Sequence, residues 1–379
     1  MSLRRTKKHI WLGLCALLLP IIAACAPGGG TASPAPAPAA EESPAAGGGG
    51  DKVLRIHQPT YPLILDPQKS SFVNEIAVLA MNYEGLTKLN AELESVPAAA
   101  EEWETSEAGD VYTFTLRSDL QYSDGSPLTS ENFRYAIERT CDPATAGEYQ
   151  SILFEIVGCA EFAETAITDT AAYEEARDAL GVEAPDEQTL VVRLTNPAPY
   201  FPYIAGLWVM YPVKQELVEA GGENWWENVE NHVGNGPFRV TEIAQDQLIS
   251  FETNENYWEG SPALDGLEYV YQGDSAVALQ AYEAGQLDIM QPDPSQLPNL
   301  RGGPLADQLL IYPAANSYNL TMSLTKEPFE DIKVRQAFSQ AIDRQTYCEV
   351  IRNGDCIPTL TWIPEGIPGH VETDQYGYD

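Results

Sequence analysis

The chain has 379 residues, which is enough for two or three domains, and its apolar fraction of 44% is ordinary for a globular protein. Its formal net charge of −35 is unusual, because a surface this acidic repels phosphate backbones and anionic lipid headgroups. The charge argues against nucleic-acid binding. A dispersed, solvated acidic face is the simplest interpretation, and a preference for cationic solutes is the alternative.

Residues 1–24 have the pattern of a secretory signal peptide. Basic residues between positions 4 and 8 precede an apolar stretch that is too short for a comfortable membrane span. The run Ile22-Ala23-Ala24-Cys25 resembles the lipobox of bacterial lipoproteins, in which the cysteine is lipidated and becomes the mature N-terminus. Ordinary cleavage after Ala24 and a retained anchor helix are the alternatives. The resemblance implies a protein at the outer face of the cytoplasmic membrane or in the periplasm, anchored through Cys25.

Residues 25–50 are predicted to be a disordered, lipid-anchored linker. Ala, Pro, Gly, Ser and Thr dominate this segment, and Glu41 and Glu42 are its only charged residues. Such a composition cannot bury a core. A flexible coil of this length spans roughly 25–30 Å. We therefore expect the segment to act as a tether.

Four further cysteines remain in the exported part of the chain. Their even number in an exported protein predicts disulfides, and the local pairs Cys141–Cys159 and Cys348–Cys356 are favoured. Zinc binding is the alternative use. Neither pair has CxxC spacing and the histidines are scattered, so no metal and no cofactor are predicted.

Alternating apolar residues and high β-propensity predict the strands. The first strand is expected at 53–57, the next at 111–117 and a third at 189–194. A return strand is expected at 287–290. Strands and helices mix throughout, which is typical of an α/β or α+β class with sizeable sheets.

Three helices are predicted from their caps and apolar spacing. Thr129 caps the first, which carries Phe133, Ala136 and Ile137 on one face. Ser275 is expected to cap the second, with Gly285 just past its end. The third follows Asp331, carries an apolar face and stops at Gly354; its inward residues are Val334, Ala337, Phe338, Ala341 and Ile342.

No enzyme motif is visible in the sequence. The GxSxG elbow, HExxH and the P-loop are all missing, and His57, His232 and His370 each stand alone. Asp119 and Asp124 could be imagined as a glycosidase pair. A tight turn before a capped helix explains Asp124-Gly125 more simply, so we predict no catalytic residue.

Aromatic and amide side chains in predicted loops are candidates to line a ligand site. Ordinary core packing is the alternative for each of them. They are Tyr61, Phe72, Asn74, Tyr83, Tyr122, Tyr200, Phe201, Trp208, Trp225, Trp226 and Tyr318.

Eight ordered segments make the chain similar to the family-5 extracellular solute-binding proteins, the dipeptide, oligopeptide and nickel receptors of ABC importers. The resemblance runs from Val53 to the last residue. Each segment alone is weak, but the eight in the family's order are specific. They include Leu65-Asp66-Pro67, Tyr83-Glu84-Gly85-Leu86, Gly234-Asn235-Gly236-Pro237-Phe238, Asn256-Tyr257-Trp258 and the strongest match, which runs from Pro328 to Phe338.

The resemblance implies a two-lobed clamshell of the periplasmic-binding-protein type II class, with an extra subdomain in lobe one. By this resemblance, residues 51–85 and 206–313 form lobe one and residues 86–205 form the inserted subdomain. Residues 314–379 begin lobe two, and 317–320 are expected to be a crossing strand that offers backbone groups to the ligand. A monomer that delivers peptides to an ABC permease is implied.

Ligand-binding roles are carried over from the family by position. They fall on Ser70, Ser71, Phe72, Asn74, Tyr122, Asn235, Gly236, Tyr318 and Asn319. The same family also includes receptors for other solutes, so nickel chelate, opine and oligosaccharide are alternative ligands. An exported, lipid-anchored hydrolase and a purely structural surface protein are alternatives of other classes.

The resemblance has one departure. Family members continue for a long stretch beyond the position of Asp379, and that stretch includes a Trp-x-x-Asp-Tyr segment whose aspartate binds the amino group of the peptide. This sequence has no such segment. We therefore expect an incomplete second lobe, exposed apolar surface there, and weak or no solute binding by this chain alone.

Overall fold

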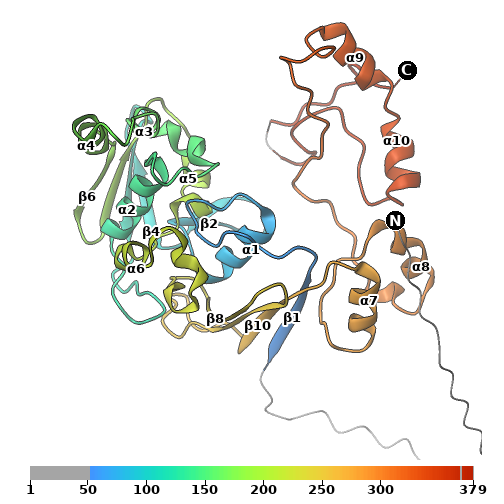
Figure 1. The fold of residues 1–379 in the computed structure, drawn as a ribbon, viewed down its shortest axis with the longest axis horizontal. Coiled ribbons are helices and arrows are strands. Elements are labelled where there is room, and N and C mark those ends of the chain that lie inside the picture. Colours follow the sequence, from blue (N-terminus) through green and yellow to red (C-terminus); the bar gives the residue numbers. More distant parts are fainter. Residues whose placement is uncertain (1–51, 368, 379) are drawn as a thin grey trace, which may run out of the picture. The chain divides into compact units, whose positions relative to one another are not determined.

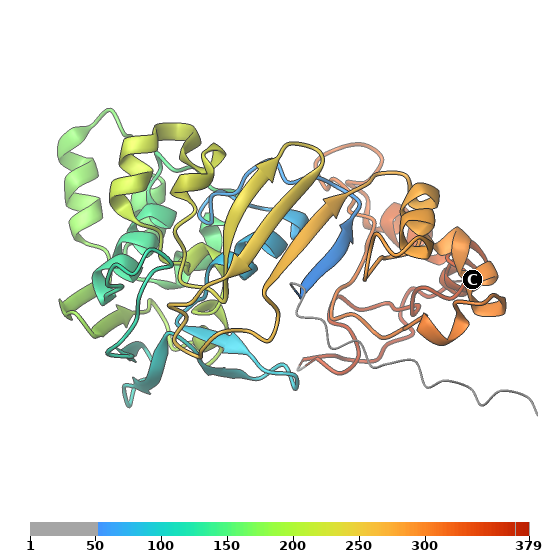
Figure 2. The ribbon, with the colours of Figure 1, turned by 90° about the horizontal axis from the view of Figure 1, so that it is seen from below.

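The computed structural model describes residues 52–367 and 369–378. The signal peptide, the lipidation at Cys25 and the linker at 25–50, all predicted from the sequence, lie outside the described residues. Figures 1 and 2 show the chain from two directions.

A four-stranded mixed sheet contains the first strand of the chain. β1 runs parallel to β10, and β10, β9 and β8 follow one another in antiparallel pairs (Figure 2). The predicted strand at 53–57 is confirmed. The strands are β1 Val53–Gln58, β8 Phe238–Ala244, β9 Leu248–Thr253 and β10 Gly266–Tyr271.

One hydrophobic core involves this sheet. The side chains of Phe251 and Tyr269 pack edge to face, with ring centroids 5.5 Å apart. Tyr83 stacks on Tyr211 at 6.1 Å in the same core, and Trp225 is 1% exposed. Tyr83 and Trp225 are therefore core residues. Of the two interpretations that the sequence allowed for them, core packing holds and a ligand-lining role does not.

A second four-stranded sheet, in the order β4-β5-β7-β6, has its own core. Along β5, the side chains of Tyr112, Phe114 and Leu116 are buried and those between them are half-buried, which is the alternation that the sequence predicted. The strands of this sheet are β4 Ala100–Thr105, β5 Val111–Leu116, β6 Val182–Asp186 and β7 Thr189–Arg193. A separate hairpin pairs β2 Thr87–Leu89 with β3 Ser95–Pro97.

The predicted helix after Thr129 is α2, Ser130–Cys141, and Thr129 is its N-cap. Phe133, Ala136 and Ile137 are each 0% exposed, so the predicted face is the buried one. A disulfide joins Cys141 at the end of α2 to Cys159 at the start of α3, and a second joins Cys348 to Cys356. Both predicted pairings are confirmed.

The remaining helices are mostly short. The α-helices are α1 Val73–Asn82, α3 Cys159–Ala163, α4 Thr170–Asp178, α5 Phe201–Ile204, α6 Gln215–Gly221, α7 Ser275–Glu283, α8 Leu297–Gly302, α9 Ile332–Gln340 and α10 Arg344–Thr346. The 3₁₀ turns are η1 Gln150–Glu155, η2 Trp208–Met210, η3 Gly222–Glu227, η4 Val229–Asn231, η5 Pro294–Gln296 and η6 Ala306–Gln308, and η7 Tyr347–Ile351 is a π-helical turn.

The cap predicted for α7 is wrong by one residue. Asp274 is the N-cap, and its carboxylate accepts hydrogen bonds from Ala276 N at 2.8 Å and Val277 N at 3.3 Å. A carboxylate can satisfy two N–H groups and favours the positive end of the helix, so it outcompetes the neighbouring serine. Gly285 follows the helix with φ +70°, as predicted.

The return strand predicted at 287–290 does not form as a strand. Only an isolated parallel bridge between Ile289 and Ile56 is present there. His57 N donates to Ile289 O at 2.9 Å. Pairing does not continue because Pro292 and Pro294 follow and have no N–H to contribute.

The last part of the described chain departs most from expectation. The helix predicted after Asp331 begins there, with Asp331 as the N-cap of α9. The predicted inward face is not buried, since Phe338 is 46% exposed. The expected strand at 317–320 does not form, because it has no strand partner within the described residues; Tyr318 is 92% exposed. The helical turns resume at 344–351, and Gly354, with φ +77°, ends them.

In the part of the chain that the structure describes, no helix is long and apolar enough to cross a membrane. Nor do those residues bring together three His, Cys, Asp or Glu side chains in an arrangement that could hold a metal ion.

Candidate solute-binding site

The two parallel strands β1 and β10 end at the same edge of their sheet. Gln272 N donates to Gln58 O at 3.0 Å, so the loops that follow the strands start side by side. The β8–β9 turn reaches the same edge, because Tyr271 N donates to Gln247 O at 2.8 Å. In open α/β sheets, ligands bind outside the carboxyl ends of parallel strands. We call residues 59–64, 72–73, 245–247 and 272–274 the β1/β10 edge.

One buried carboxylate shapes this edge. Glu75, which is 1% exposed, accepts hydrogen bonds from Ile64 N at 3.0 Å, Ser71 N at 2.8 Å and Phe72 N at 3.1 Å. Because the oxygens of one carboxylate join these groups, residues 63–64 and 71–73 lie next to each other.

Asn74 fixes the first half of the same loop. Its side-chain amide donates to Tyr61 O at 3.1 Å and to Thr60 O at 3.3 Å. Tyr61 in turn packs edge to face on Tyr271, with ring centroids 4.8 Å apart. The start of α1 therefore holds the whole segment from residue 60 to residue 64 against the end of β10.

Three apolar side chains project from this rigid loop. Leu63 is 80% exposed, Phe72 61% and Val73 84%. Single exposed apolar residues are common on protein surfaces, but three on one braced segment, made of the loop and the start of α1, indicate a contact surface. We call Leu63, Phe72 and Val73 the apolar triad.

Of the residues predicted on this loop, the structure gives only Phe72 an outward side chain. Ser70 is 1% exposed: its hydroxyl donates to Ile64 O at 2.8 Å, and its carbonyl accepts from Trp208 Nε1 at 2.8 Å. Ser71 and Asn74 are half-buried and brace the loop. Their ligand-binding roles stay predictions.

Sequence reasoning missed Leu63 and Val73. An apolar residue in these positions most often belongs to a core, so its type alone does not indicate a contact surface. The available signal was their place between the first strand and the start of α1, since parallel strands place ligand-contacting segments at this edge.

The sequence profile of the bacterial extracellular solute-binding proteins, family 5, matches residues 94–379. The chain belongs to this family. The fold class predicted from the sequence, the two-lobed periplasmic-binding-protein type II class, is confirmed by this match and by the solved structures that resemble the chain.

Among curated relatives, the probable deoxycholate-binding periplasmic protein YgiS of Escherichia coli K12 is 30% identical over 97% of this chain and 64% of its own length. The oligopeptide-binding protein OppA of Bacillus subtilis is 29% identical over 87% of this chain and 59% of its own length. The structure of Haemophilus influenzae OppA in complex with the peptide RPPGFSPFR superimposes with a TM-score of 0.72 at 28% identity, over 83% of this chain and 60% of that one. The chain thus spans less than two thirds of the length of these relatives.

Tyr122, Asn235 and Gly236, which were predicted to contact ligand, are placed inside the fold. Asn235 clamps the backbone of Glu84: its Oδ1 accepts from Glu84 N and its Nδ2 donates to Glu84 O, each at 3.0 Å. Tyr122 is 1% exposed, and burial raises the pKa of its hydroxyl well above the usual value. The exposed Tyr318 and Asn319 contact neither the apolar triad nor Asn235 through any hydrogen bond formed among the described residues. The ligand roles of all five stay predictions.

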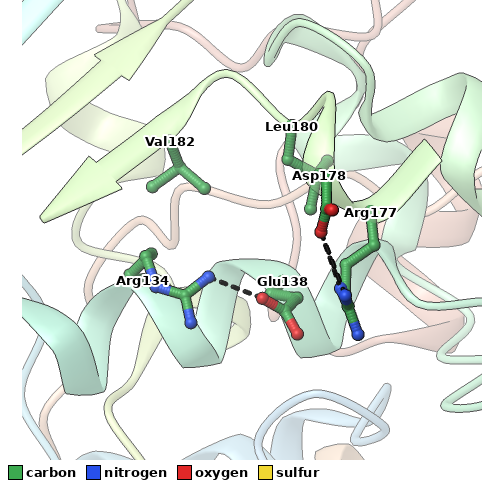
Figure 3. Close-up of a pocket in the computed structure, with 6 residues that line it drawn as sticks. All are labelled: Arg134, Glu138, Arg177, Asp178, Leu180 and Val182. Carbon is green, nitrogen blue, oxygen red and sulfur yellow. Dashed lines mark hydrogen bonds and ion pairs between the residues drawn. The ribbon is translucent and has the colours of Figure 1, made fainter. Parts of the chain in front are cut away.

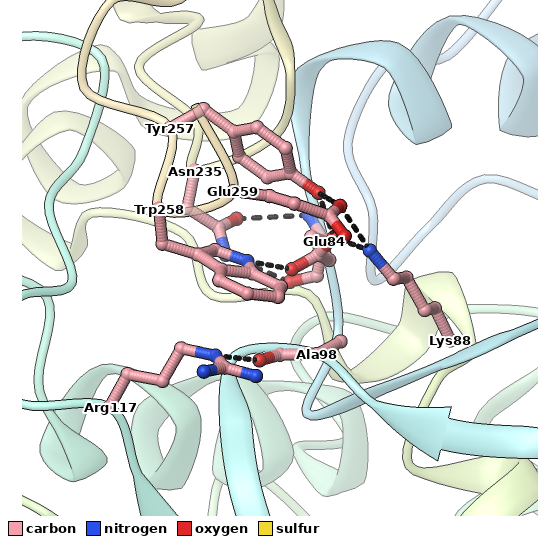
Figure 4. Close-up of polar contacts among 8 residues, drawn as sticks. All are labelled: Glu84, Lys88, Ala98, Arg117, Asn235, Tyr257, Trp258 and Glu259. Atoms are coloured by element: carbon pink, nitrogen blue, oxygen red, sulfur yellow. Dashed lines mark hydrogen bonds and ion pairs between the residues drawn. The ribbon is translucent and has the colours of Figure 1, made fainter. Parts of the chain in front are cut away.

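Several family-5 motifs meet at the side chain of Glu84 (Figure 4). Its carboxylate, in a residue that is 7% exposed, accepts from Trp258 Nε1 and Tyr257 OH, each at 2.5 Å, and Lys88 Nζ lies 3.7 Å away. Burial raises the pKa of Glu84, and the hydrogen bonds from Tyr257 and Trp258 offset part of that rise.

Arg117 extends this cluster to the second sheet. Its guanidinium carbon lies 3.6 Å from the ring centre of Trp258, and its Nε donates to Ala98 O at 2.7 Å (Figure 4). Segments far apart in the sequence, around Glu84, Ala98, Asn235 and Trp258, therefore meet in one structural cluster. The motifs that identify the family here stabilise the fold.

Asp66 of the Leu-Asp-Pro motif has a similar structural position. Its carboxylate, which is 0% exposed, makes a two-pronged ion pair with Arg139 of α2 at 2.5 and 2.6 Å. Trp225 Nε1 also donates to it at 3.0 Å. Because Asp66 and Trp225 border one core and α2 borders the other, this pair links the two cores.

Two surface hollows do not match the requirements of a solute site. The first, of about 340 Å³, is bounded by the ion pairs Arg134–Glu138 at 2.6 Å and Arg177–Asp178 at 3.0 Å (Figure 3). The second, of about 640 Å³, contains the ion pair Arg239–Glu252. The basic groups that line both hollows are already paired, and neither hollow includes a residue of the β1/β10 edge.

Each described histidine contacts a different backbone carbonyl. His57 Nε2 lies 2.8 Å from Gln272 O, His232 Nε2 lies 2.6 Å from Trp226 O, and His370 Nδ1 lies 2.7 Å from Ile363 O. Contacts of this kind are structural. His232 differs from the other two because its burial lowers the pKa of its ring, which makes stability depend on pH.

We expect the stability of the protein to fall in acid because of His232. Burial lowers the pKa of this histidine to about 4, whereas the unfolded chain has the ordinary value near 6.5. Stabilisation by neutral His232 is complete above pH 6.5 and is lost as the pH falls through about 4, where the folded state also takes up the proton. The loss reaches roughly 3 kcal/mol.

The contribution of His232 to the pH dependence of stability can be measured by urea unfolding of the wild type and of His232→Gln at several pH values. Glutamine can still donate to Trp226 O and does not titrate, so the difference in unfolding free energy between the two proteins should shrink from pH 7 to pH 4. Parallel pH profiles would show that His232 does not contribute.

Proposed function

We propose that this chain is the extracytoplasmic solute-binding component of an ABC importer, and that its solute is a peptide held at the β1/β10 edge. The observation that carries the proposal is the exposed apolar triad on a loop braced by buried Glu75. Relatives named as oligopeptide-binding proteins, and a solved relative in complex with a nonapeptide, support a peptide over other solutes.

The loop also offers backbone groups of the kind that a peptide needs. Among the described residues, the backbone N–H groups of Thr60, Tyr61 and Leu63 donate no hydrogen bond. An extended peptide can accept these bonds in a strand-like manner, while its side chains contact Leu63, Phe72 and Val73. Binding of this kind depends little on peptide sequence.

Capture by the proposed receptor is an equilibrium between an open and a closed form. A peptide that contacts both lobes binds the closed form better, so its binding shifts the population toward closure. The permease then distinguishes the closed, loaded receptor from the open one. No covalent chemistry by the receptor is involved.

The proposal includes the cellular location of the protein. Lipidation at Cys25 and the linker at 25–50 would hold a monomeric receptor at the outer face of the cytoplasmic membrane or in the periplasm, near its permease. Nickel chelate, opine or oligosaccharide as solute, and a lipid-anchored hydrolase, remain the alternatives, and no contact within the described residues favours one of them.

Titration of the whole chain with the peptide RPPGFSPFR tests the proposal. Since the sequence predicts weak or no binding by this chain alone, peptide should be added up to millimolar concentration, and binding should be followed by intrinsic tryptophan fluorescence. Trp208 is a suitable reporter, because its indole N–H bonds Ser70 O next to Phe72. We expect a saturable change that Phe72→Ala weakens about fivefold or more, without a change in melting temperature.

Leu89→Ala is the matched control, because Leu89 is 55% exposed and lies on β2 instead of the β1/β10 edge. It should leave binding unchanged. Absence of saturable binding, an equal loss in both variants, or binding of deoxycholate in place of the peptide would each overturn the proposal.

A further inference from the structure

The charge near the apolar triad is negative and is not neutralised by any ion pair among the described residues. Asp246, in the β8–β9 turn, and Asp274, directly after β10, are both exposed at the β1/β10 edge. Among the described residues, neither has an ion-pair partner; the basic side chains that make ion pairs do so elsewhere. Two carboxylates without a basic partner among the described residues therefore lie at the edge that carries the triad, and that of Asp274 also caps α7.

Both carboxylates flank the loop that carries the triad. Asp274 follows Gly273, where a Cβ would lie 3.8 Å from Pro59 O. Asp246 precedes Gln247, whose carbonyl accepts from Tyr271 N. The pKa of Tyr61 is raised by burial and, in addition, by the charge of Asp246, so the field of Asp246 reaches this loop.

Basic groups close to the edge in sequence are engaged elsewhere. Lys69 Nζ lies over the ring of Trp226, 5.6 Å from its centroid. Arg55 donates to Gly285 O at 3.1 Å. The wider surface adds to the local effect, because the chain as a whole carries −35.

We propose that the β1/β10 edge selects cationic peptides that carry an apolar side chain. This inference rests on the proposed function and adds a substrate class to it. The triad contacts the apolar side chain, and Asp246 and Asp274 attract flanking ammonium or guanidinium groups. Anionic solutes are repelled both by these carboxylates and by the field of the whole chain.

Three pentapeptides with free termini test the inference: AKFKA, AQFQA and AEFEA. They have the same length and the same central phenylalanine and differ only in charge. At an ionic strength of 20 mM, AKFKA should bind about tenfold tighter than AEFEA. At 500 mM the Debye length falls to about 4 Å, so the two affinities should converge to within about twofold.

A double variant, Asp246→Asn with Asp274→Asn, isolates the local contribution. Asparagine tolerates the φ of +58° at position 246 and is an equally good helix cap at position 274, so the fold should be kept. We expect the preference for AKFKA over AEFEA at low salt to fall about threefold or more.

The matched control is Glu101→Gln with Glu102→Gln, which removes two exposed charges from β4. It should leave the preference nearly unchanged. The inference is overturned if AKFKA and AEFEA bind equally at low salt, or if the control lowers the preference as much as the edge variant does. Binding of none of the three peptides would instead contradict the proposed function itself, since AQFQA tests peptide binding without charge.

Discussion

Replacing Arg139 with alanine is expected to lower the free energy of unfolding by about 3–5 kcal/mol. Arg139 is the only basic partner of Asp66 within the described residues, and the carboxylate of Asp66 is 0% exposed. The variant would leave a charge buried without a counter-ion. It would also remove the bond from Arg139 to Gln68 Oε1, at 2.7 Å.

Chemical denaturation of the wild type and the variant measures this cost. Arg193→Ala is the matched control, because Arg193 pairs with Glu183 at the surface, where both side chains are about half exposed. Exposed pairs contribute about 1 kcal/mol or less, so the control should unfold close to the wild type. Equal effects in the two variants would mean that the buried Asp66–Arg139 pair stabilises the protein no more than an exposed pair does.

The loss of unfolding free energy in Arg139→Ala should also be insensitive to salt. Screening by added ions acts on exposed charges and reaches buried pairs much less. We therefore expect the difference between Arg139→Ala and the wild type to be similar at 50 and 500 mM salt. For an exposed pair such as Arg193–Glu183, the small difference should disappear at the higher concentration.

Sequence patterns such as strand alternation, helix caps and cysteine spacing correctly predicted the elements whose residues interact mainly with their sequence neighbours. The alternation in β5, the cap at Thr129 and the two short-range disulfides all follow from nearby residues, and all are confirmed. The apolar face of α9 shows the limit of this approach. Its spacing was recognised correctly, but spacing cannot say what covers the face, and Phe338 remains 46% exposed.

The ligand roles predicted for single residues remain predictions, and the structure shows only where these side chains lie. Ligand roles were assigned to Asn235 and Tyr122 by position in the family, and amides and aromatics serve equally well to hold backbone or to contact solute. Only the tertiary contacts show that Asn235 brackets Glu84. Leu63 and Val73 were missed for the converse reason, since an apolar loop residue usually belongs to a core.

Replacing Gly234 with alanine is expected to abolish folding to the native state. An added Cβ would lie 1.8 Å from Asn82 O and 2.7 Å from Asn82 C, and both are backbone atoms that cannot move aside alone. The carbonyl of Gly234 also accepts from Ser123 N at 2.7 Å, which ties this segment to a second loop. The cost should exceed about 4 kcal/mol, a size that point mutants reach only through a specific structural clash.

Soluble yield, circular dichroism and urea unfolding report this effect, and Gly302→Ala is the control. A Cβ at Gly302 meets no heavy atom within 4 Å, so that variant should stay within about 1 kcal/mol of the wild type. The comparison also separates two roles for the Gly-Asn-Gly motif. If the motif brings residues 82–84 into place, Gly234→Ala fails before any ligand is added. If the motif instead serves mainly to contact solute, the variant folds normally and loses only peptide binding, which would contradict the structural role assigned to it here.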